Sequence, residues 1–169
     1  MKGRCSAVLA LFLVATQLAS LSAARPDESR PPANLHVDLA LQLLVERMWS
    51  TSPTFQRQCR RLAEEPSVLV TVSREDPSAG PSLANAWTAL TFKGNTLVAA
   101  QVHIKPASNG AELIAHELEH VLEQLDGVDV RAQAGNGAVW KNGKASFETK
   151  RAIEAGRRVA REILDRRVR

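Results

Sequence analysis

The sequence predicts an α+β fold, in which a small antiparallel or mixed sheet packs against a central helix that is followed by a C-terminal helix. Two helical patterns occur before residue 65 and two more after residue 108, and β-rich segments with a hairpin turn lie between them. The chain of 169 residues is long enough for one modest core. We therefore expect residues 35–169 to form a single domain.

The first 24 residues have the pattern of a secretory signal peptide. Lys2 and Arg4 begin it, an apolar stretch follows, and small residues at 22–24 offer a cleavage site. The stretch is shorter than the roughly 20 apolar residues that a membrane span requires. Residues 25–34 contain three prolines and are expected to form a flexible leader. The pattern predicts an exported protein, periplasmic or secreted, with no membrane span after cleavage.

Net charge and cysteine content limit the partners that we expect. Cleavage would remove Lys2 and Arg4 and lower the formal net charge from +4 to +2. Many basic residues lie in the last helix without the aromatic or motif support of a nucleic-acid-binding surface, so we expect no nucleic-acid partner. Cys59 would then be alone, which excludes a disulfide within the chain. We expect a buried thiol; a disulfide between chains is the alternative, and the oligomeric state stays open.

Two helices are expected at the start of the domain. The first spans Leu35 to about Ser50, with apolar residues at helical spacing: Leu39, Leu43, Leu44 and Met48. Ser52 and Pro53 then form a cap followed by proline at the first helical position. The second helix should extend to about Glu64 and bury three side chains: Phe55, Cys59 and Leu62.

The period then changes to that of strands. Val68 to Val72 is rich in β-branched residues and predicts a strand. Trp87 to Phe92 and Thr96 to Ile104 flank Lys93-Gly94-Asn95, a strong hairpin signal. The middle of the domain is therefore expected to form the sheet.

The last two helices follow this hairpin. Asn109 and Glu112 have the spacing of a capping box, and the helix that they begin should end at Gly127, a favourable left-handed C-cap. A loop rich in glycine and asparagine follows. Ser146 is then expected to cap a final helix from Phe147 to about Arg166.

The central helix carries His116-Glu117-Leu118-Glu119-His120. On a helix the two histidines lie about 40° apart in projection and one turn from each other, so both imidazoles can reach one metal ion. Glu117 lies about 100° round from His116, where it can take a proton from metal-activated water without binding the metal. The opposite side of the helix is apolar: Ile114, Leu118, Val121, Leu122 and Leu125. A metal-binding helix face is predicted; a polar face with two incidental histidines is the alternative.

This motif, which follows strands and precedes a final helix, resembles that of the zincin-type HExxH zinc metallopeptidases. The resemblance covers roughly Val68 to Arg166, and the motif is its specific part. It implies that His116 and His120 bind one Zn²⁺ and that Glu117 is the general base. It also implies that the upstream strand, Thr96–Ile104, pairs with an extended substrate.

Catalytic zinc has three protein ligands and a water, and Glu148 is the leading candidate for the third ligand. Glu148 lies on the expected inward stripe of the last helix, where a carboxylate is costly unless it is paired or bound to metal. The gluzincin branch of the zincins also completes its site with a glutamate from the helix after the motif. A helix-dipole role at the N-terminal end of this helix is the alternative. The separation from His120 is longer than in that branch, and Ala152 stands where some members carry a supporting aspartate.

Asp126 and Glu123 are the other candidates. Asp126 stands six residues after His120, where metzincin-like enzymes place a third ligand. The metzincin-like pattern has a glycine three residues after the second histidine, where the chain turns sharply. This sequence has Glu123 at that position, so the helix should continue and carry Asp126 away from the metal. Glu123 shares the histidine face and is expected either to bind the metal or, preferably, to accept a proton from a ligand imidazole.

These features predict a peptidase that binds one Zn²⁺ per chain through His116, His120 and Glu148. It would hydrolyse a peptide or protein substrate with metal-activated water, and Glu117 would be the general base. The alternative is an exported, zinc-stabilised binding or scaffold protein without turnover. A closed fourth ligand, such as Glu123 or Asp126, would favour that alternative.

Overall fold

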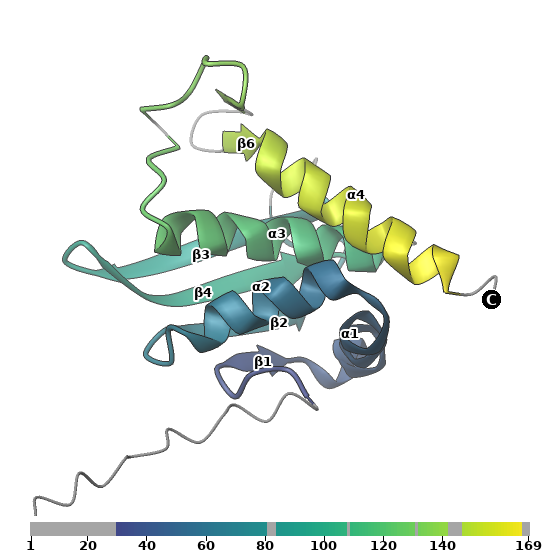
Figure 1. The fold of residues 1–169 in the computed structure, drawn as a ribbon. Helices are drawn as coiled ribbons and strands as arrows, with labels where there is room; N and C mark the ends of the chain where they lie inside the picture. Colours follow the sequence, from purple (N-terminus) through teal and green to yellow (C-terminus); the bar gives the residue numbers. More distant parts are fainter. Residues whose placement is uncertain (1–29, 81–83, 108, 131, 142–146, 167–169) are drawn as a thin grey trace, which may run out of the picture.

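A computed structural model describes residues 30–80, 84–107, 109–130, 132–141 and 147–166 (Figure 1). These residues form an α+β fold with a four-stranded mixed sheet, a separate two-stranded sheet and four helices, which confirms the predicted class. The expected signal peptide, residues 1–24, and residues 25–29 of the expected leader lie outside the described residues. Among the described residues, no helix combines the length and apolar character needed to cross a membrane.

The main sheet has the strand order β1-β2-β4-β3. Its parallel strands are β1 (Leu35–Val37), β2 (Leu69–Arg74) and β4 (Thr96–Ile104). β3 (Ala86–Lys93) runs antiparallel to β4. The turn between these two contains Gly94 at φ 61°, a left-handed conformation that glycine adopts without strain. The predicted hairpin is confirmed, and β3 lies at an edge of the sheet.

The helices gather on one face of this sheet (Figure 1). They are α1 (Leu39–Thr51), α2 (Pro53–Ala63), α3 (Gly110–Leu125) and α4 (Lys150–Asp165), which packs against α3. The core lies between sheet and helices. Its largest fully buried apolar side chains include Phe55, Met48, Leu62, Ile104, Ile114 and Leu118.

The start of the domain differs from the prediction. Residues 35–37, expected to be helical, form β1 and pair with β2, and α1 begins only at Leu39. Asp38 joins the two elements: its backbone N–H donates to the carbonyl of Val72, and its carboxylate accepts from the N–H of Arg74. Because these two bonds tie Asp38 to β2, they fix where the helix begins.

The buried face of α1 also differs from the prediction. Of the four apolar residues noted at helical spacing, Leu39 and Leu43 are each 82% exposed, Leu44 is partly buried and Met48 is buried. Leu41 and Val45 are buried together with Met48. This leucine-rich segment offers two faces with helical spacing, and the attachment of Asp38 to β2 selects the one that faces the core.

α2 follows the prediction. The hydroxyl of Ser52 accepts a hydrogen bond from the N–H of Phe55 at 3.0 Å, and Pro53 occupies the first turn. Phe55, Cys59 and Leu62 are fully buried. Cys59 is the free cysteine of the described residues, and burial raises the pKa of its thiol to about 12. The expectation of a buried structural thiol is therefore confirmed.

The strand that was expected to pair with substrate is internal to the sheet. β4 pairs with β2 along one edge and with β3 along the other, so neither edge is open to an extended peptide. That expectation for Thr96–Ile104 is wrong. The strand of this hairpin with an unpaired outer edge, within the described residues, is β3.

The ends of the last two helices are partly as expected. At the start of α3, the side chain of Asn109 makes no capping hydrogen bond, so the expected capping box with Glu112 does not form. At its end, Gly127 follows the helix at φ 72°, as predicted. α4 begins at Lys150 rather than Phe147, because Phe147–Thr149 forms strand β6, which pairs antiparallel with β5 (Val139–Lys141). The hydroxyl of Thr149 caps α4 by accepting from the N–H of Ala152. Ser146, the expected cap, lies outside the described residues.

Candidate metal centre

α3 holds the two histidines of the motif on one face. The rings of His116 and His120 have centroids 5.0 Å apart and planes at 80° to each other. The opposite face is buried in the core, as predicted, and fixes the rotation of the helix: Ile114, Leu118, Val121 and Leu122, with Leu125 partly buried. Because these apolar residues anchor the helix, both imidazoles lie together on its other face, 16% and 18% exposed.

Glu148 reaches the histidines from β6. Its Oε1 atom lies 3.0 Å from Nε2 of His116 and 3.3 Å from Nε2 of His120. The pairing of Glu148 with Trp140 of β5 holds this part of the chain in place. The prediction put Glu148 on the last helix; it lies on the strand just before that helix. The structure nevertheless brings together the three side chains that the sequence predicts as metal ligands.

The distances from Glu148 to the two histidines are close to the spacing of zinc ligands. Zn–N distances of about 2.0–2.1 Å and Zn–O distances of about 2.0–2.2 Å, in a tetrahedron, put neighbouring ligand atoms roughly 3.3 Å apart. The two histidine–glutamate distances are 3.0 and 3.3 Å, and all three ligand atoms lie within 4.8 Å of one another. Within the described residues the cluster has no fourth histidine, cysteine or carboxylate. Such a donor set suits zinc with a fourth position left for water or substrate.

The cluster favours a positive charge at its centre. Burial disfavours the imidazolium of His120, but hydrogen bonds to Glu123 and Glu148 outweigh it and raise the pKa of His120 to about 10. Burial would raise the pKa of Glu148, but hydrogen bonds from His116 and His120 lower it to about 2. A proton and a metal ion would therefore compete for the same place.

Glu123 supports the ring of His120. Its Oε2 atom lies 2.9 Å from Nδ1 of His120, and its Oε1 atom accepts a hydrogen bond from the hydroxyl of Thr149 at 2.7 Å. A partner on Nδ1 fixes the orientation of the imidazole and leaves Nε2 for a metal. Glu123 is thus a hydrogen-bond partner of a candidate ligand, the position that we preferred from the sequence.

Glu117 lies beside the cluster. Its side chain is buried, and Oε2 accepts a hydrogen bond from the hydroxyl of Thr88, on β3, at 2.8 Å. Burial raises the pKa of Glu117, although the bond from Thr88 and the charges of His120 and His116 act in the opposite direction. A carboxyl group with a raised pKa next to the metal ligands suits proton transfer near neutral pH.

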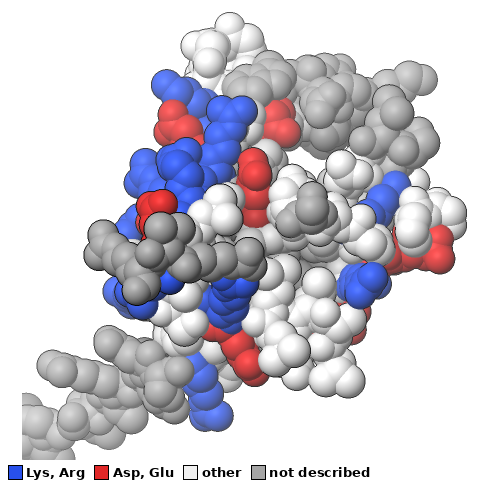
Figure 2. Space-filling model, turned by 90° about the vertical axis from the view of Figure 1, so that its right-hand side faces the viewer, with Lys and Arg blue, Asp and Glu red and all other residues white. Residues whose placement is uncertain are grey.

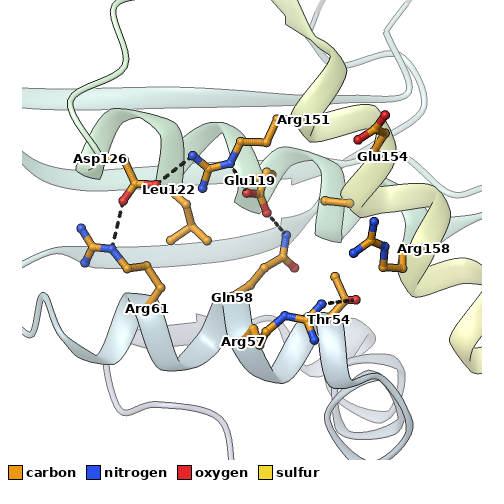
Figure 3. A pocket seen from close by; sticks show the side chains of 11 residues that line it. Thr54, Arg57, Gln58, Arg61, Glu119, Leu122, Asp126, Arg151, Glu154 and Arg158 are labelled. Atoms are coloured by element: carbon orange, nitrogen blue, oxygen red, sulfur yellow. Dashed lines mark hydrogen bonds and ion pairs between the residues drawn. The ribbon is translucent and has the colours of Figure 1, made fainter.

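Asp126 forms ion pairs with two arginines (Figure 3). Its carboxylate lies 3.0 Å from Arg61 of α2 and 2.8 Å from Arg151 of α4. Arg151 also donates to Glu119 at 2.6 Å. Asp126 therefore takes no part in the cluster, in agreement with the expected continuation of the helix. Together these ion pairs join α2, α3 and α4.

Three residues that position the site escape sequence reasoning: Thr88, Thr149 and Arg151. Their contacts with Glu117, Glu123 and Glu119 span 29, 26 and 32 residues of sequence. Local periodicity carries no signal for contacts over such separations. A signal did exist for Thr149, because threonine is a favoured N-cap residue and the helix indeed begins after it.

The arrangement can therefore hold one divalent cation next to a buried carboxylate. The three candidate ligands come from α3 and β6. Comparisons with protein-family models, with curated proteins and with solved structures give no match.

Proposed function

We propose that this protein is a zinc-dependent peptidase whose metal ligands are His116, His120 and Glu148. The observation that carries the proposal is the cluster of three ligand atoms within 4.8 Å of one another, with the buried Glu117 beside it. The zincin-like order of elements supports it: a mixed sheet with an antiparallel edge strand, the motif helix packed on that sheet, and a final helix packed on the motif helix.

Each residue of the site has a distinct part in this proposal. Bound zinc supplies Lewis acidity, which polarises a carbonyl group and lowers the pKa of water. Glu117 would accept the proton of the attacking water and pass it to the leaving amine. Thr88 holds the carboxylate of Glu117 in place for both transfers. Glu123 keeps the ring of His120 in its binding orientation.

The edge of β3 is where we place the substrate. Among the described residues β3 pairs only with β4, so an extended peptide can add to the other edge of β3 and gain main-chain hydrogen bonds. Thr88 of β3 touches Glu117, so a peptide bound along this strand would run close to the proposed general base. This geometry favours a peptide or protein as the substrate. The signal-peptide pattern supports cleavage of this substrate outside the cytoplasm, in the periplasm or after secretion.

Zinc content and cleavage of a peptide library, measured on the same samples, test the proposal. We expect one zinc per chain in the wild type, loss of zinc in His116→Ala and Glu148→Ala, and retention of zinc in Glu117→Gln. Cleavage by Glu117→Gln should fall by roughly 10²–10⁴-fold, since removal of general-base catalysis has that effect.

Matched controls separate the site from the rest of the surface. His36→Ala and Glu154→Ala remove the same kinds of side chain at exposed positions and should change neither zinc content nor cleavage. Zinc retained in Glu148→Ala would refute the proposed third ligand. Full zinc binding by the wild type without cleavage of any peptide would refute the peptidase and leave a zinc-stabilised binding protein.

A further inference from the structure

A cavity separate from the metal cluster lies between α2, α3 and α4 (Figure 3). Its volume is about 440 Å³, within the roughly 300–1,000 Å³ that small-molecule sites have. None of the three proposed metal ligands lines it. Four arginines and three carboxylates line it, together with the side chain of Gln58.

Gln58, which lines this cavity, carries a buried hydrogen-bond acceptor. Its side-chain Nε2 donates to the carbonyl of Ala115 at 2.9 Å and to the carboxylate of Glu119 at 2.5 Å. Because both neighbours can only accept, the orientation of the amide is fixed. Its oxygen, Oε1, is buried and has no hydrogen-bond partner among the described residues, and Gln58 is only 4% exposed. In Figure 3 this oxygen points away from Glu119, toward the side of the cavity where Arg158 lies.

An acceptor of this kind calls for a donor. Buried polar atoms in native proteins are nearly always hydrogen-bonded, since an unpaired one has lost its bond to water without replacement. The described protein atoms around the oxygen provide no such donor. A ligand in the cavity that carried an N–H or O–H group would provide it.

The same side of the cavity carries two arginines, Arg57 and Arg158. Arg158 makes no ion pair with the described residues, and Arg57 donates to the hydroxyl of Thr54 at 2.9 Å. The carboxylates nearby already have partners: Glu119 and Asp126 bind Arg151, Glu154 binds Lys150, and Glu162 accepts from Ser52 and Thr54. Figure 2 shows Lys and Arg side chains gathered on its left, the side that faces the viewer in Figure 1, where α2 and α4 lie.

We propose that this cavity binds a small anion that also carries an N–H or O–H donor. Arg57 and Arg158 would bind its anionic oxygens, and Oε1 of Gln58 would accept a hydrogen bond from its N–H or O–H group. Inorganic phosphate is a suitable probe with both features, because it is an anion that keeps an O–H group at neutral pH. Sulfate has similar size and charge but no proton to donate.

Titration of the full chain with phosphate and with sulfate at equal ionic strength tests this proposal. Binding is followed by calorimetry and by the rise in unfolding temperature. Phosphate should bind saturably, and sulfate at least roughly tenfold more weakly, because it leaves the oxygen of Gln58 unpaired. Equal affinity for the two anions, or no saturable phosphate binding, would overturn the proposal.

Variants locate the bound phosphate. Arg158→Ala should weaken phosphate binding by roughly tenfold, the loss of one charge-assisted contact. Arg157→Ala removes the same charge from the adjacent exposed position, which does not line the cavity, and should leave the affinity unchanged. An equal loss of phosphate affinity in both variants would mean that general surface charge, and not the cavity, attracts the anion. If His116→Ala lost phosphate binding while Arg158→Ala kept it, the anion would bind at the proposed metal site instead. Each of these two results would overturn the proposal.

Discussion

Gly156 of α4 lies directly against His116 of α3. A Cβ atom at Gly156 would stand 3.1 Å from the Cβ of His116 and 2.7 Å from the backbone oxygen of Glu112. A glycine inside a helix costs about 0.5–1 kcal/mol relative to alanine. The close approach that it permits brings the helix that follows Glu148 against the helix that carries both histidines.

We expect Gly156→Ala to separate these helices. In an open helix this change would be stabilising, but here the added methyl group meets backbone, and overpacking of this kind costs about 1–3 kcal/mol. Urea unfolding should show that loss, and a chelator-competition titration should show weaker zinc binding. Arg157→Ala, at the neighbouring exposed position, is the control. A stabilised Gly156→Ala protein would mean that the helices do not pack as closely as described.

Thr149 joins the metal centre to the start of α4, and its removal should weaken both. Its hydroxyl donates to Glu123 and accepts from the N–H of Ala152. Thr149→Val should lower the free energy of unfolding by about 1 kcal/mol through the lost cap and weaken zinc binding roughly 10- to 100-fold through Glu123. Thr149→Ser keeps the hydroxyl and should restore both. Equal zinc affinity in the two variants would contradict a role of Glu123 in holding His120.

The stability of the metal-free protein should fall at alkaline pH. The pKa of His120 is raised from 6.5 to about 10 in the fold, so its stabilising contribution is complete below pH 6.5 and is lost as the pH rises through about 10. Urea unfolding in the presence of a chelator, at pH 7 and above pH 10, measures the loss. His120→Asn should show a smaller decrease over that range.

Zinc binding near pH 7 should release protons for the same reason. A metal-free His120 that is protonated at this pH must give up its proton to bind zinc, so we expect about one proton per zinc from this residue. Calorimetry in buffers of different ionisation enthalpy gives that number. A binding enthalpy independent of the buffer would contradict the expectation.

Glu162 should make the fold sensitive to acid. Burial alone would raise its pKa, but hydrogen bonds from Ser52 and Thr54 lower it below the usual 4.5. Its contribution is therefore present above pH 4.5 and is lost as the pH falls below that value. Glu162→Gln should be less stable than wild type by about 1–2 kcal/mol at pH 7. The difference should shrink at pH 3, and a constant difference would contradict this account.

Local patterns predicted the elements that depend on short-range chemistry. Lys93-Gly94-Asn95 identified the hairpin, and the spacing of His116 and His120 put both on one helix face. Glu148 was selected because of an inward stripe that continues through Ala152 and Gly156, which are indeed buried. Glu148 itself lies on β6, because residues 147–149 pair with β5 and the helix begins only at Lys150.

Long-range contacts account for what could not be predicted. β1 exists because residues 35–37 pair with β2, more than 30 positions away, and that pairing also decides which leucines of α1 are buried. The bond from Thr88 to Glu117 depends on how the sheet meets α3. Sequence spacing encodes neither event.

Because Glu148 lies on β6, an ion bound at the proposed site would also constrain the chain. His120 and Glu148 are 28 residues apart in sequence, so an ion bound by both closes the intervening chain into a ring, as a disulfide would. Bound zinc would then favour the native chain by mass action, in proportion to the logarithm of its free concentration. In a chain whose described part has no disulfide, a bound ion would act as a removable cross-link between the end of the motif helix and the start of the final helix.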